Sequence, residues 1–122
     1  MRFVKNSKLE KGDIIRVKRS KGYYHYGIAK SEDEVIHFTG PLNDSINDTK
    51  NIQIRLTTLD LFLRGDVLEV LRPYSSIYTP ETVVERAMSF IGQSEFLGKS
   101  YKNYFFGNNI INKSTEKIVD KK

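Results

Sequence analysis

Short apolar runs, each closed by turn-forming residues, are the feature that most limits what this chain can fold into. The runs alternate apolar and polar positions or are rich in aromatic and β-branched residues, which is typical of strands rather than helices. Turns rich in glycine, proline, serine and aspartate separate them, and an antiparallel arrangement of neighbouring strands is expected. The expected strands are residues 13–18, 23–29, 34–38, 52–56 and 66–71.

One segment reads clearly as a helix. Residues 80–91 follow Thr79, which can cap the first turn, and begin with Pro80, which suits the first helical position. A short helical turn or an extended piece is expected over 59–63, and a short final helix over 114–120. The sequence therefore predicts an α+β fold: a small antiparallel sheet of about five strands with one main helix packed on one face.

The length and composition favour one small domain. The chain has 122 residues, of which 39% are hydrophobic. We expect a basic N-terminal segment over 1–9, the domain over 10–112 and a hydrophilic tail over 113–122. No apolar run approaches the roughly 20 residues that span a bilayer, and the start lacks the apolar core of a secretory signal. A cytoplasmic protein, at most peripheral to membranes, is expected.

The absence of cysteine excludes several kinds of site. A chain with no cysteine and two histidines holds no disulfide, no cysteine–zinc site and no cysteine nucleophile. No metal and no cofactor are expected.

Positive charge gathers at the N-terminal end. The formal net charge is +5, and eight of the 20 basic residues fall within residues 1–21. Such a cluster attracts phosphate, either in nucleic acid or in anionic lipid headgroups, but it is also compatible with a solvated face. No aromatic RNA-binding motif or helix-turn-helix signature accompanies it, so nucleic acid ranks below the other partners.

The two histidines, His25 and His37, both fall inside expected strands. A hairpin centred on Ser31 places them directly opposite each other, with Cβ atoms roughly 4.5–5.5 Å apart, whereas a four-residue loop makes the pair diagonal. Two facing imidazoles can act as a base and the group that orients it. The alternative is that both are structural, one half-buried and one exposed.

Three consecutive motifs resemble a known family. They are Gly12-Asp13-Ile14-Ile15, then Tyr24-His25-Tyr26-Gly27-Ile28, then Glu34-Val35-Ile36-His37-Phe38, and a helix-like segment ending in glycine follows over residues 80–92. In this order, with twelve residues between the histidines, they resemble the histidine-box region of the lecithin retinol acyltransferase-like family. That family belongs to the circularly permuted NlpC-type papain-like superfamily, and the resemblance covers residues 10 to about 93.

The resemblance implies a thiol acyl-transfer site. Active members take an acyl chain from a phospholipid through a thioester and pass it to water, an amine or an alcohol. Carried over to this chain, His25 would be the base that forms the thiolate, and His37 the second imidazole that orients or polarises it. The nucleophile would follow the glycine that closes the helix by about a dozen residues, in a block that begins a further helix.

The nucleophile is where this chain departs from the family pattern. A gapless continuation puts Tyr104 at the cysteine position and a gapped one puts Ile110 there, and neither supplies a thiol. A tyrosine is a poor substitute, because its pKa is near 10 and its ring needs more room. Substitution by a nearby serine hydroxyl (Ser94, Ser100 or Ser114) is the alternative.

Three functions follow from these observations. The first is a catalytically inactive or impaired family member retained for binding an acyl chain, a lipid headgroup, an anionic membrane surface or a protein partner, as in small viral 2A-like proteins that interact with host factors. The second is an active acyltransferase or hydrolase with a non-cysteine nucleophile. The third is a basic nucleic-acid-binding domain.

Overall fold

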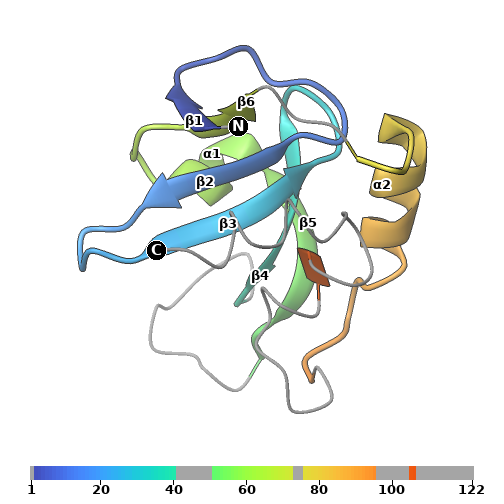
Figure 1. Ribbon diagram of the computed structural model, residues 1–122. Coiled ribbons are helices and arrows are strands. Elements are labelled where there is room, and N and C mark those ends of the chain that lie inside the picture. Colours follow the sequence, from blue (N-terminus) through green and yellow to red (C-terminus); the bar gives the residue numbers. More distant parts are fainter. Residues whose placement is uncertain (1, 41–50, 73–75, 96–104, 107–122) are drawn as a thin grey trace.

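A computed structural model describes residues 2–40, 51–72, 76–95, 105 and 106. Within these ranges the chain forms six strands in one antiparallel sheet, in the order β1-β6-β2-β3-β4-β5, and two helices (Figure 1). The strands are β1 (Arg2–Lys5), β2 (Ile14–Lys18), β3 (Tyr24–Ala29), β4 (Glu34–Thr39), β5 (Gln53–Thr58) and β6 (Glu69–Arg72). The helices are α1 (Leu59–Leu63) and α2 (Pro80–Met88). The α+β class and the antiparallel sheet are confirmed.

The sheet has one strand more than the sequence predicts. Strand β1 lies within the basic segment 1–9 and pairs along its whole length with β6, from Arg2 opposite Arg72 to Lys5 opposite Glu69. The last strand begins at Glu69 rather than at residue 66, because Asp66 closes the turn that follows α1. The domain boundaries at 10 and 112 stay a prediction, and the expected final helix over 114–120 lies outside the described residues.

Alternate residues of each strand point to opposite faces of the sheet, and each face has its own hydrophobic core. On one face, Ile14, Ile28, Ile36 and Ile54 pack against α2. On the other face, Ile15, Val17, Ala29, Val35 and Val70 pack against Phe62 of α1. The expectation of a single helix on one face is therefore incomplete. Residues 59–63, for which the sequence leaves a helical turn or an extended piece open, form the helix α1 and cover the second face.

Helix α2 begins where the sequence predicts and ends earlier. The Thr79 hydroxyl accepts a hydrogen bond from the Thr82 N–H at 3.2 Å, as an N-cap does. Val83, Val84 and Ala87 are buried, and burial of each valine stabilises the fold by about 1.5–3 kcal/mol. The helix ends at Met88 instead of residue 91, because the N–H groups of Phe90 and Ile91 donate to the carbonyls three residues back instead of four, both at 3.1 Å. Gly92 then adopts a left-handed φ of 92°, and its N–H donates to the Ile54 carbonyl of β5 at 2.9 Å.

Candidate functional site

The two histidines lie on the same face of neighbouring strands, the face that α1 covers. His25 is on β3 and His37 is on β4, and their ring centroids are 5.1 Å apart. Nε2 of His25 is 2.8 Å from Nδ1 of His37, within hydrogen-bonding distance. The prediction that the imidazoles meet is confirmed.

The expectation that His25 and His37 lie directly opposite each other is wrong, and the diagonal arrangement is the one that forms. The strands pair Gly27 with His37 and Ala29 with Val35, so the hairpin is centred one residue later than Ser31. The turn is closed by the Lys30 N–H, which donates to the Glu34 carbonyl at 2.9 Å. This shift makes the imidazoles diagonal neighbours, which aromatic rings can bridge.

The residue directly opposite His37 is Gly27, and its lack of a side chain leaves room for the Phe62 ring beside the imidazoles. A Cβ on Gly27 would lie 2.7 Å from Cγ1 of Val35 and 3.0 Å from Cε1 of Phe62, closer than side-chain atoms pack. The Phe62 ring uses that space and lies against both imidazoles, with centroids 5.3 Å from His25 and 5.0 Å from His37. Helix α1 therefore holds the imidazole pair through one aromatic side chain.

A third polar side chain, on the neighbouring strand β5, contacts the imidazole pair. Oγ1 of Thr57, on β5, is 2.7 Å from Nε2 of His37 and 3.0 Å from the carbonyl oxygen of Thr58. His37 is 2% exposed and Thr57 is 6% exposed, so this end of the site is dry. His25 is only partly buried, so the hydrogen-bonded chain runs from the core toward the surface.

Burial keeps both imidazoles neutral. It lowers the pKa of His25 to about 3, with Arg19 and Arg64 adding a smaller effect of the same sign. Burial also lowers the pKa of His37 well below its usual 6.5, helped by His25 and then by the same two arginines. At neutral pH each ring therefore carries one proton and one lone pair.

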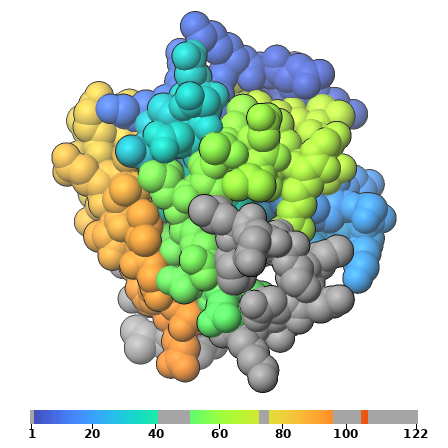
Figure 2. All heavy atoms as spheres, turned by 180° about the vertical axis from the view of Figure 1, so that it is seen from behind, coloured from blue at the N-terminus to red at the C-terminus, as the bar shows by residue number. Residues whose placement is uncertain are grey.

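Arg19 fastens the β2–β3 hairpin to the end of α1. Its guanidinium donates to the carbonyls of Phe62 at 2.8 Å and Leu63 at 3.1 Å, and it pairs with Asp66 at 3.3 Å. These carbonyls end the helix, where cationic donors stabilise it. Figure 2 shows the hairpin, in blue, beside α1 and the residues that follow it, in green and yellow-green.

Part of the N-terminal basic cluster is therefore structural. Besides Arg19, the guanidinium of Arg16 lies 2.9 Å from Glu69 and is sandwiched between the rings of Phe3 and Tyr24, 3.9 and 3.8 Å from their centroids. These two of the eight basic residues are held by acidic partners and do not add to a freely available positive surface.

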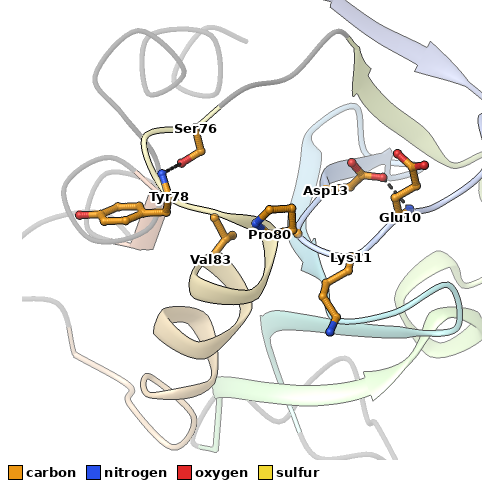
Figure 3. A pocket seen from close by; sticks show the side chains of 8 residues that line it. Glu10, Lys11, Asp13, Ser76, Tyr78, Pro80 and Val83 are labelled. Atoms are coloured by element: carbon orange, nitrogen blue, oxygen red, sulfur yellow. Dashed lines mark hydrogen bonds between the residues drawn. The ribbon is translucent and has the colours of Figure 1, made fainter.

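A separate pocket of about 310 Å³ lies where the chain before β2 meets the start of α2 (Figure 3). Glu10 and Asp13 both line it, and the Asp13 carboxylate accepts from Arg72 at 2.7 and 2.9 Å and from the Glu10 N–H at 2.7 Å. Neither histidine lines this pocket. Asp13 thus fixes the entry to β2 and stands apart from the imidazole pair.

The two positions considered for the nucleophile, Tyr104 and Ile110, lie outside the described residues. Phe105 and Phe106 are described and buried, and they belong to the α2-side core together with Tyr26. The imidazoles lie on the opposite face. Among the described residues, no serine hydroxyl hydrogen-bonds to His25, whose one hydrogen-bond partner is His37.

Sequence reasoning missed three members of the site: Gly27, Thr57 and Phe62. Gly27 stands between the two histidines, two positions from His25 in the chain, and that spacing on a strand puts both on one face. The alternation of β5 was visible too, but its register against β4 was needed to bring Thr57 next to His37. Nothing local marks Phe62, since α1 reaches the imidazoles through tertiary packing.

Comparison with known proteins adds one match. A family model described as lecithin retinol acyltransferase matches residues 7–99. None of the curated proteins searched matches the chain. The matched residues contain the histidine pair, Gly27, Thr57 and Phe62.

Proposed function

The chain belongs to the lecithin retinol acyltransferase family, and from that premise we propose that it is a member whose acyl-transfer site keeps its imidazoles but has lost its nucleophile. The observation that carries the proposal is the 2.8 Å contact between His25 and His37 in a chain with no cysteine. Such a protein is catalytically inactive or strongly impaired and acts by binding. We further propose that its sheet is the permuted papain-like frame of the family.

The chemistry that the family implies needs two partners: an imidazole that acts as a base and a thiol that acts as the nucleophile. An imidazole removes the thiol proton, and the thiolate then attacks the acyl carbonyl of a phospholipid to form a thioester. The ester C–O bond breaks in this step, and the lysophospholipid leaves as an alcohol with the proton that the imidazolium returns. The first partner is in place here: two neutral imidazoles lie in contact beneath Phe62. The second partner is absent, because the sequence has no thiol at any position.

Two positions stay open for the lost nucleophile: Tyr104 by the gapless continuation and Ile110 by the gapped one. Restoring a thiol at each position tests both.

We propose that the retained role is binding an acyl chain or a lipid headgroup at an anionic membrane surface, in the cytoplasm. The exposed basic side chains near the N-terminus support this choice: Lys5, Lys8, Lys11, Lys18 and Lys21. Among the described residues, no helix is long and apolar enough to cross a membrane. A protein partner is the alternative occupant, and nucleic acid ranks third.

The test of the lost nucleophile is phospholipid turnover. The native chain, Ile110→Cys and Tyr104→Cys are incubated with vesicles of a phospholipid that carries a fluorescent acyl chain. We expect acyl release from one cysteine variant and none from the native chain. The matched control adds His25→Ala to the active variant, which should abolish release because the base is gone.

Binding is measured separately by sedimentation with vesicles. We expect the native chain to pellet with vesicles rich in phosphatidylserine, to stay in solution with pure phosphatidylcholine, and to be released by salt. Equal binding to both vesicles, or to neither, would count against the membrane role. Release of acyl chains by the native chain would instead favour an active enzyme with another nucleophile.

A further inference from the structure

Thr57 stands at the buried end of the hydrogen-bonded chain that passes through both imidazoles. Its hydroxyl has one proton and two contacts: the Thr58 carbonyl oxygen at 3.0 Å and Nε2 of His37 at 2.7 Å. A carbonyl oxygen can only accept, so the first contact is a hydrogen bond only when Thr57 gives its proton to Thr58. Oγ1 of Thr57 then accepts from His37, whose Nε2 must carry a proton.

This direction extends to the second ring. A neutral His37 with its proton on Nε2 has a bare Nδ1, so the contact at 2.8 Å requires Nε2 of His25 to donate. Nδ1 of His25 is then left with its lone pair. Within the described part of the chain, His25 makes no other hydrogen bond, so this lone pair is the free end of the hydrogen-bonded chain.

We propose that Thr57 is a positioning residue: by accepting the Nε2 proton of His37, it holds both rings in the tautomers that leave Nδ1 of His25 as the proton-accepting nitrogen of the site. This inference deepens the proposed function. It rests on that function only for the role of Nδ1 of His25 as the base of an acyl-transfer site. The tautomers themselves are a property of the native chain, whether or not it turns over a lipid.

The reverse direction would have a different chemical outcome. If Thr57 donated to His37, its oxygen would face the Thr58 carbonyl at 3.0 Å lone pair to lone pair. Both imidazoles would change tautomer, and Nδ1 of His25 would carry a proton. A site in that state could not accept a proton at this nitrogen. The direction of the hydrogen bond between Thr57 and His37 thus decides whether Nδ1 of His25 can act as a base.

The experiment is an NMR spectrum of the chain labelled with ¹⁵N in its histidines, at pH 7. Long-range proton–nitrogen correlations separate protonated from bare ring nitrogens, and two histidines give an uncrowded spectrum. In the native chain we expect Nε2 protonated and Nδ1 bare in both rings. Thr57→Ser keeps the hydroxyl and should give the native pattern.

Thr57→Val keeps the shape and removes the acceptor. The buried Nε2 proton of His37 is then unpaired, and the ratio of tautomers should shift toward Nδ1 protonation in both rings by about tenfold or more. Thr57→Ala makes the same comparison if the valine variant does not fold. The proposal is overturned by a native His25 protonated on Nδ1, or by a folded Thr57→Val with the native pattern. Neither result depends on lipid turnover, so the proposed function stands or falls separately.

Discussion

Acidification should destabilise this fold well above the pH at which carboxylates titrate. The folded chain keeps His25 and His37 neutral because burial lowers the pKa of both, that of His25 to about 3. In the unfolded chain both imidazoles take up protons near pH 6.5. Below that pH the unfolded state binds more protons than the folded state, so the free energy of unfolding falls as the pH falls.

The size of the effect follows from this proton difference. Each histidine that stays neutral in the fold costs about 1.4 kcal/mol per pH unit once the pH is well below 6.5. Between pH 7 and pH 5.5, where the transition in the unfolded chain is still under way, the cost is about 1.2 kcal/mol per ring. The pair therefore removes about 2.5 kcal/mol, a large share of the stability of a small domain.

Urea unfolding at pH 7.0, 6.25 and 5.5 measures this loss. The matched control is the double variant His25→Gln, His37→Gln, which has no histidine and should lose little stability over the same range. A native chain whose free energy of unfolding changes by less than about 0.5 kcal/mol would refute the reasoning. It would mean that the imidazoles take up protons as readily in the fold as in the unfolded chain, so burial would not hold their pKa down.

Three substitutions test contacts at the imidazole site and at the entry to β2 by urea unfolding. Gly27→Ala puts a methyl group against two buried side chains and should cost about 1–3 kcal/mol; native stability would show that the sheet yields there. Arg19→Met leaves two carbonyls at the end of α1 without their cationic donor and should cost about 1–3 kcal/mol, whereas the exposed control Lys21→Met should stay within about 0.5 kcal/mol. Asp13→Asn removes the charge that faces Arg72 at 2.7 Å and should cost about 1–3 kcal/mol; no loss would make this ion pair incidental.

The sequence predicts the strands well because the signals that specify them are local. Alternation within 14–18, 24–29 and 34–39, with turn residues between, places three neighbouring strands within a residue or two of their ends. Strand β1 was missed because four residues with two apolar side chains carry little signal, and its pairing with β6 joins positions far apart in the chain. A local sequence pattern does not indicate which distant strand a short segment pairs with.

The candidate site divides in the same way. That His25 and His37 meet follows from two adjacent strands. Only the register was misjudged: the turn that closes between Lys30 and Glu34 is centred one residue later than expected, and this shifts the pairing by two residues. Thr57 could not be assigned, because it joins the site through the pairing of β4 with β5 across a connection of more than a dozen residues. The lowered pKa of each imidazole depends on burial, which only the packed structure supplies.

The central claim is that an intact imidazole pair has outlived its nucleophile. The most direct measurement is release of a fluorescent acyl chain by the native protein, compared with His25→Ala under the same conditions. We predict that both release no more than a buffer blank. Turnover by the native chain that disappears in His25→Ala would contradict the claim, because it would show that this pair still activates a nucleophile other than cysteine.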